Sequence, residues 1–98
     1  MKPRRPQLSP MECRILSELE VHGGDAGISG TQLARLAKLC RGTLYVLLGR
    51  LAAASPARVR RRRARVPGRN EHQVLYTITS SGRRARERFA ADVGLNPH

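Results

Sequence analysis

Two amphipathic helical patterns follow each other with almost no connecting residues, and this succession limits the possible folds more than any other feature of the chain. The first spans residues 28–39, where Ser29 is a candidate N-cap with Gln32 three positions later. The second spans residues 40–54. We expect one apolar face on each helix, formed by Leu33, Ala34, Leu36 and Ala37 in the first and by Leu44, Leu47, Leu48 and Leu51 in the second. So short a connection leaves two helices packed together at an angle.

A third helical pattern precedes these two. Ser9 is a good N-cap, Pro10 suits the first helical position, and Glu12 completes a capping box. The expected helix, residues 8–21, has an apolar face formed by Leu8, Met11, Ile15, Leu16 and Leu19. Three glycines within residues 22–27 predict a loop, after which Ile28 is placed to pair in a short strand.

Residues 57–70 contain seven arginines and no acidic residue. Charges of one sign at this density repel one another unless something outside the chain compensates them. Residues 72–79 follow with the alternation of a half-buried strand, whose inward positions are Val74, Tyr76 and Ile78. The arginine stretch is therefore expected to be the partner strand of a β-hairpin, although a disordered loop before a single strand is the alternative.

The hairpin has a clear turn but an irregular first strand. Pro67 and Gly68 fit the centre of a type II turn. Side chains at odd and even positions of a strand point to opposite faces, so Val59 lies on one face and both Ala64 and Val66 on the other. This pattern indicates either a bulge or a hairpin whose far end has no buried face. We favour the free-standing hairpin, because it tolerates charge on both sides.

A last helical pattern begins after Thr79, a candidate cap, and its apolar side is formed by Ala85, Phe89 and Val93. The chain is expected to form one domain, residues 8–93, between a flexible basic arm of residues 1–7 and a flexible tail of residues 94–98. The fold class is mainly α with a β-hairpin (α+β). The order helix, helix, helix, basic hairpin, helix predicts a winged helix-turn-helix.

The charge of the chain points to a polyanionic partner. Lys and Arg number 19 against 7 Asp and Glu, which gives a net charge of +12. Nearly all of these cations are arginines, whose planar fork can bond two phosphate oxygens, although a G+C-rich genome would favour the same residue. The third helix would enter the major groove of double-stranded DNA, and the hairpin would reach the neighbouring phosphates or the minor groove.

Other classes of site have little support in the sequence. Cys13 and Cys40 lack zinc-site spacing and form no disulfide framework, so we expect reduced thiols in a cytoplasmic, nucleoid-associated protein. No signal peptide and no membrane span are recognisable. The three histidines are scattered and the seven acidic residues form no pair. We expect no enzymatic activity, no catalytic residue, no metal and no cofactor.

Two segments resemble a known family. GTLYVLLGRL, residues 42–51, resembles the recognition helix of PadR-type winged-helix transcription regulators, whose pattern is roughly Gly-Thr-Leu-Tyr-x-x-Leu-x-Arg-Leu. LYTITSSGRRA, residues 75–85, is similar to the end of their wing and the start of the next helix, usually Tyr-x-Leu-Thr-x-x-Gly-x-x-Ala. Residues 8–19 resemble the first helix of the family. The resemblance covers about residues 8–90 and extends to MarR-like winged helices, which share the second motif.

The chain departs from the family pattern in three ways. Val46 stands where a proline is usual, and residues 52–54 are alanines where acidic residues are common, followed by Ser55 where a glycine often ends the helix. The chain also has a single closing helix, whereas many members have a long dimerisation domain. Because family members are dimers, the resemblance implies a homodimer whose candidate interface on the first and last helices comprises Leu16, Phe89 and Val93. Phe89 has an alternative role, which is to close the core of the monomer.

The sequence therefore predicts a sequence-specific, double-stranded-DNA-binding transcription regulator that acts as a dimeric repressor, with no effector ligand indicated. Thr43 and Val46 would approach base edges, while Tyr45 would bond a phosphate. The candidate contacts on the helices are Thr31, Gln32, Arg41, Thr43, Tyr45, Val46 and Arg50. Those on the wing are Arg58, Arg60, Arg61, Arg62, Arg63, Arg65 and Arg69.

Two other functions fit the same charge. An RNA-binding or ribosome-associated protein is one, although one Phe, two Tyr and no Trp offer few stacking platforms for single-stranded RNA. A winged-helix module that binds a protein of the transcription machinery is the other.

Overall fold

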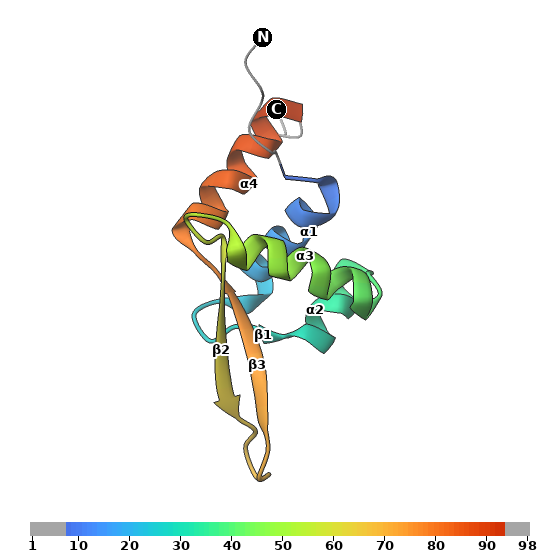
Figure 1. Ribbon diagram of the computed structural model, residues 1–98, viewed down its shortest axis with the longest axis vertical. Coiled ribbons are helices and arrows are strands. Elements are labelled where there is room, and N and C mark those ends of the chain that lie inside the picture. Colours follow the sequence, from blue (N-terminus) through green and yellow to red (C-terminus); the bar gives the residue numbers. More distant parts are fainter. Residues whose placement is uncertain (1–7, 94–98) are drawn as a thin grey trace.

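The computed structural model describes residues 8–93, with side chains placed through residue 91. Its elements are α1 (Pro10–Glu18), the π-helical turn η1 (Leu19–Gly23), β1 (Ile28–Ser29), α2 (Gly30–Ala37), α3 (Arg41–Ala53), β2 (Val59–Arg65), β3 (His72–Ile78) and α4 (Ser80–Val93). The helices pack around one core and the β2–β3 hairpin extends away from them, at the end of the molecule opposite to α4 (Figure 1). The predicted α+β class is confirmed. The predicted arm of residues 1–7 and tail of residues 94–98 lie outside the described residues.

The first helix begins as predicted and ends differently. Ser9 and Glu12 form the capping box: the Glu12 carboxylate accepts from the Ser9 backbone N–H at 2.9 Å, and the Ser9 hydroxyl accepts from the Glu12 N–H at 3.2 Å. This bond folds Glu12 back into a buried position, whereas Met11 is half exposed. The prediction that Met11 faces the core is therefore wrong. The helical path also continues beyond Glu18 as η1, which ends where Gly24 takes a positive φ of 53°.

The connection between α2 and α3 is as short as the sequence predicts. The Ser29 hydroxyl caps α2 by accepting from the Gln32 N–H at 3.2 Å. The helix ends at Ala37, because Lys38 adopts a left-handed φ of 58° and the Leu39 N–H bonds back to the Ala34 carbonyl at 3.0 Å. α3 begins three residues after Lys38, and half-buried Leu39 in this connection packs against the core.

The predicted apolar faces of α2 and α3 are confirmed. Leu33 and Ala37 of α2 are fully buried, as are Leu44 and Leu51 of α3. Leu47 and Leu48 complete the buried side of α3, and Ile15, Leu16 and Leu19 meet them from the first helical segment within one core cluster. The core thus covers one side of α3 and leaves its other side open.

The sheet has three antiparallel strands in the order β1-β3-β2, and Ile28 supplies the short strand β1 as predicted. Pairing in the hairpin runs without a bulge from Val59↔Ile78 to Arg65↔His72. The turn is the predicted one: Gly68 has a φ of 75°, and the Arg69 N–H bonds to the Val66 carbonyl at 3.1 Å.

The free-standing hairpin is confirmed. Burial is confined to the base of the hairpin, where Val59, Tyr76 and Ile78 enter the core. Val74 is 38% exposed, so its predicted inward position is wrong. The reason is that the strands extend past the helices, and no apolar surface remains for Val74 to meet.

The base of the hairpin is anchored to α4 by Thr79. Its hydroxyl donates to the Ala57 carbonyl at 2.6 Å and accepts from the Gly82 N–H at 3.0 Å, which confirms the predicted cap. The Thr79 N–H also donates to the Arg58 carbonyl at 3.1 Å. From the first turns of α4, Arg86 then pairs with Glu20 of η1 at 2.6 Å. These contacts hold the hairpin, α4 and η1 together.

Candidate nucleic-acid interface

The side of α3 that faces away from the core forms a continuous exposed stripe. Its members recur at helical spacing and are Gly42, Tyr45, Val46, Gly49, Arg50 and Ala53. Val46 is 60% exposed and Tyr45 is 47% exposed, and both are among the few large apolar side chains that the described residues leave open. Around Gly42 and Gly49 an added Cβ would meet nothing within 4 Å. The stripe therefore presents two large side chains between two places where a partner could approach the backbone closely.

The starts of α2 and α3 are joined directly. Arg41 Nη2 donates to the Thr31 hydroxyl at 2.9 Å, which brings two of the predicted contact residues together. Gln32 is exposed beside them. These side chains form a polar edge next to the exposed stripe of α3.

Cys40, the N-cap residue of α3, lies at the same edge. Its thiol donates to the Thr43 hydroxyl at 3.1 Å. When the thiol loses its proton, hydrogen bonds from Thr43, first from its side chain and then from its backbone, stabilise the thiolate and lower the pKa of Cys40. Thr43 is half-buried and engaged by this bond, so it presents less free surface than Val46.

The strand register divides the wing arginines between two faces. Cross-strand partners share a face, so Arg61, Arg63 and Arg65 lie on the face of Tyr76, Val74 and His72. At the base of the hairpin this is the core-facing side, because Val59 and Ile78 are buried there. The face defined by Arg61, Arg63 and Arg65, here called the odd face, is thus on the helix side of the sheet.

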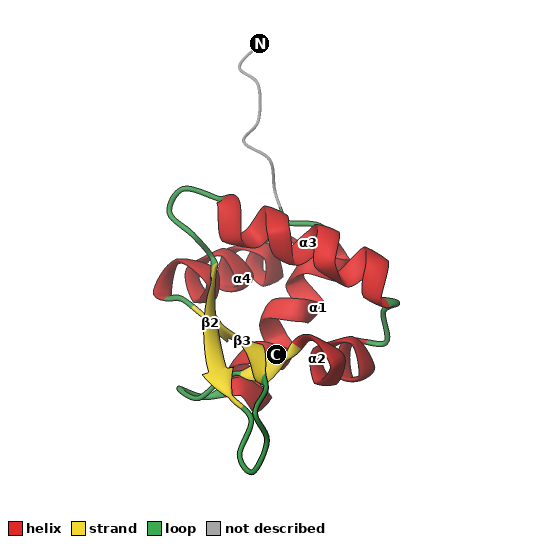
Figure 2. Cartoon of the chain, turned by 60° about the horizontal axis from the view of Figure 1, so that its bottom comes forward, coloured by secondary structure: helices red, strands yellow, loops and turns green. Residues whose placement is uncertain are grey.

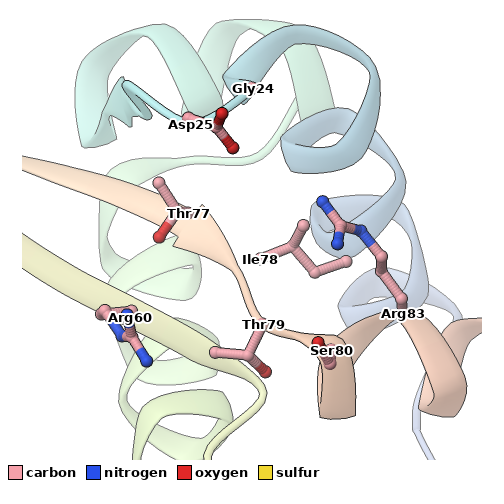
Figure 3. A pocket seen from close by; sticks show the side chains of 8 residues that line it. All are labelled: Gly24, Asp25, Arg60, Thr77, Ile78, Thr79, Ser80 and Arg83. Carbon is pink, nitrogen blue, oxygen red and sulfur yellow. The ribbon is translucent and has the colours of Figure 1, made fainter.

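Arg60 and Arg62 lie on the opposite, even face. Arg62 Nη2 donates to the Ala26 carbonyl at 3.0 Å, in the loop before β1. Arg60 lines a shallow polar cavity of about 270 Å³ with Asp25, Thr77 and Arg83 (Figure 3). Arg83 also pairs with Glu20 at 3.7 Å. The even face is therefore partly occupied by contacts within the chain.

The remaining two arginines of the wing lie at its ends. Arg58 is half-buried just before β2, and its carbonyl receives the Thr79 N–H. Arg69 is exposed in the turn at the tip. The arginines of residues 57–70 therefore lie in four different places: at the base of the hairpin, on each of its two faces and at its tip.

The residues predicted to pair two subunits do not form one surface. Leu16 is 0% exposed in the core of the single chain, so its assignment to a dimer interface is wrong. It has no surface left with which to contact a partner. Phe89 is half-buried and packs against the core, and the side chain of Val93 lies outside those described.

Other kinds of site have no support in the described residues. Within residues 8–93, no group of three His, Cys, Asp or Glu side chains could hold a metal ion. None of the described helices is long and apolar enough to cross a membrane.

Some residues of these two surfaces are absent from the contacts predicted from the sequence. Gly42 belongs to the open stripe of α3 and His72 to the odd face of the wing, opposite Arg65. A helical projection of residues 41–53 would have placed Gly42, whereas His72 needed the register of the hairpin.

The arrangement of a first helix, a short strand, a helix-turn-helix, a β-hairpin and a closing helix is the winged helix-turn-helix fold (Figure 2). Neither a protein-family model nor a curated protein sequence matches the chain. Solved structures do match it. A PadR family transcription regulator from Clostridium difficile R20291 superposes with a TM-score of 0.66 at 21% identity, over 87% of this chain and 94% of that one.

Larger structures share the fold over part of their length. A point mutant of MepR from S. aureus matches with a TM-score of 0.70 at 20% identity, over 89% of this chain and 59% of that one. The PcaV transcriptional regulator from Streptomyces coelicolor matches with a TM-score of 0.68 at 17% identity, over 90% and 57%. The chain thus spans less than two thirds of these two proteins. The winged-helix fold expected from the PadR and MarR resemblance is confirmed.

Proposed function

We propose that the chain is a sequence-specific, double-stranded-DNA-binding transcription regulator that acts as a homodimeric repressor. The observation that carries the proposal is the position of Tyr45 and Val46. They are exposed on the open stripe of α3, and the odd face of the wing lies on the side of the sheet that the helices cover. Known proteins of this fold support the proposal, since they include transcription regulators and a second MepR mutant bound to an oligodeoxyribonucleotide.

The exposed stripe suits the major groove, which is wide enough to admit one helix. Val46 would lie against base edges, where a thymine methyl group is a suitable apolar partner. Gly42 and Gly49 have no side chain to project from α3, so the helix backbone could approach the groove closely at these positions. Thr31, Gln32 and Arg41, at the polar edge, would bond the DNA backbone and fix the position of the helix.

The wing would supply affinity that does not depend on sequence. None of its arginines has an acidic partner among the ion pairs of the described residues, in which Glu20 pairs with Arg83 and Arg86 of α4. Phosphates relieve the repulsion among the wing arginines and release counterions from the duplex. Arg61, Arg63 and Arg65 are the best placed, because they share the helix side of the sheet with α3.

The experiment that tests the proposal is selection of random double-stranded DNA by the purified protein. We expect enrichment of an inverted repeat with half-site centres about 34–36 Å apart, as a dimer with one recognition helix per subunit requires. Parallel binding curves at one salt concentration compare the selected duplex, a random duplex, single-stranded RNA and an acidic protein. Tighter binding to RNA or to the acidic protein than to any duplex would contradict the proposal.

Two further measurements address the assembly and the sign of regulation. Sedimentation of the protein with the selected duplex should show two chains per site, and a single chain per site would exclude the dimer. Transcription in vitro from a promoter that overlaps the selected site should fall when the protein is added. A rise would make the protein an activator.

A further inference from the structure

A second contact between α2 and α3, besides the Arg41–Thr31 hydrogen bond, involves Tyr45. The phenol of Tyr45 lies against the backbone of Gly30, the first residue of α2. A Cβ added to Gly30 would lie 2.5 Å from the Tyr45 hydroxyl oxygen and 3.0 Å from the ring atoms Cε1 and Cζ. Any other residue at position 30 would therefore displace the ring.

Glycine at this position has a cost that the contact explains. Gly30 has no positive φ that would require glycine, and it lies at the first position of a helix, where glycine is less favourable than alanine. Gly42 and Gly49 have open space around them, but Gly30 is buried beneath Tyr45. The room that glycine leaves at position 30 is occupied by the phenol of Tyr45.

The start of α2 is joined to the base of the wing through β1. Gly30 directly follows this strand, whose residue Ile28 pairs with Tyr76 of β3. Tyr76 is buried, which raises its pKa, and the charge of Tyr45 raises this pKa further while Arg61 lowers it. Arg61 is the cross-strand partner of Tyr76. Tyr45 therefore packs from the stripe of α3 onto the start of α2, and β1 links this point to the strand that pairs with Arg61.

We propose that Tyr45 is a positioning residue, whose phenol holds α2 and α3, and through β1 the base of the wing, in one fixed arrangement, and that Gly30 is the glycine this arrangement requires. The consequence for DNA rests on the proposed function. If the recognition helix and the wing must meet one duplex together, a shift of the phenol misaligns them and selectively weakens binding to the site that fits both.

The test is a double-mutant cycle with Gly30→Ala, Tyr45→Ala and both changes together. The probes are a random 30-base-pair duplex and the duplex enriched by selection. Gly30→Ala should lower the ratio of the two affinities about tenfold, the size of coupling common between residues in contact. In the Tyr45→Ala background, Gly30→Ala should leave the ratio unchanged. An equal loss in both backgrounds would mean that Gly30 acts without Tyr45, and the proposal would be wrong.

Stability and a conservative variant separate positioning from folding. In the Tyr45→Ala background, alanine at position 30 should raise the melting temperature, because the clash is absent and the helix gains a better former. Tyr45→Phe keeps the ring and removes the hydroxyl, so the loss of a phosphate contact should weaken both duplexes by similar factors, without the fall in the affinity ratio expected of Tyr45→Ala. If Tyr45→Phe lowers the affinity ratio as far as Tyr45→Ala does, the hydroxyl group contacts the bases directly and the ring does not act by positioning the helices.

A readout without DNA distinguishes this proposal from the proposed function. The free energy of unfolding in urea closes the same cycle in the absence of DNA. Gly30→Ala should lower this free energy when Tyr45 is present and should raise it in the Tyr45→Ala background. An equal change in both backgrounds would overturn the contact even if DNA binding is established. If no duplex binds, the unfolding cycle still decides it.

Discussion

The guanidinium group of Arg62 donates a hydrogen bond to the carbonyl oxygen of Ala26, 3.0 Å away, while its neighbour Arg63 lies on the opposite face of the same strand. Four consecutive arginines, residues 60–63, are thus not equivalent. One pair faces the loop before β1 and the other faces the helix side of the sheet. Adjacent residues of one strand therefore provide matched test variants.

We expect Arg63→Ala to reduce DNA affinity through phosphate neutralisation, and Arg62→Ala to do so less. For Arg63→Ala, the slope of log affinity against log salt should fall by about 0.9 for each phosphate that is no longer neutralised. Selected and random duplexes should weaken by similar factors, as measured by fluorescence anisotropy at several salt concentrations. Equal slope changes for the two variants would show that the two faces of the wing contribute alike.

Val46→Ala should impair recognition of the selected duplex specifically. Removing a base contact should cost about 1–3 kcal/mol in each half-site, while binding to a random duplex should hardly change, since no charge is removed. Val46 is exposed, so the melting temperature should stay close to that of the wild type. Uniform weakening on both duplexes would place the reading surface elsewhere than on α3.

Two glycine substitutions in helices should have opposite effects on stability. A Cβ on Gly82 would collide with the Arg58 carbonyl and lie 2.8 Å from Ile78 Cγ1, so Gly82→Ala should lower the free energy of unfolding by about 1–3 kcal/mol. Gly49 has open space around it, so Gly49→Ala should raise that free energy by up to about 1 kcal/mol. Urea denaturation measures both.

Binding gives Gly49→Ala a second readout. If α3 lies closely in a groove, the added methyl group should weaken the selected duplex in spite of the gain in stability. A variant that is both more stable and fully active would show that the glycine has no role in close approach.

The two cysteines should differ in reactivity. Cys40 is exposed and its pKa is lowered by Thr43, whereas burial raises the pKa of Cys13. A thiol whose pKa is lowered forms thiolate at a lower pH, so a disulfide reagent should modify Cys40 first at neutral pH. Thr43→Val removes the side-chain hydrogen bond and should raise the pKa of Cys40 and slow its modification. An unchanged pH profile of that rate would mean that Thr43 does not stabilise the thiolate.

Local signals in the sequence were enough for the helix starts and the turn. Ser9 and Glu12, Ser29 and Gln32, and Thr79 act within three residues of their partners, so no tertiary information is needed to recognise them. The end of α2 was harder to place, because Lys38 takes the left-handed conformation usually left to glycine. The exposure of Met11 was missed because the apolar pattern did not show that Glu12, bonded to Ser9, would be buried in its place.

The periodicity of apolar residues determined the leucine face of α3, and with it the opposite face that is free to meet a partner. The charge of residues 57–70 determined that the hairpin would have an exposed distal part, because seven arginines cannot share a core. Only the tertiary structure decided which arginines share a side with α3, since that depends on the register of β2 against β3 and on which face of the sheet the helices cover. The tertiary structure alone showed that Leu16 is buried within the single chain and that Tyr45 packs against Gly30. The apolar pattern of one element does not show which residues of another element it will contact.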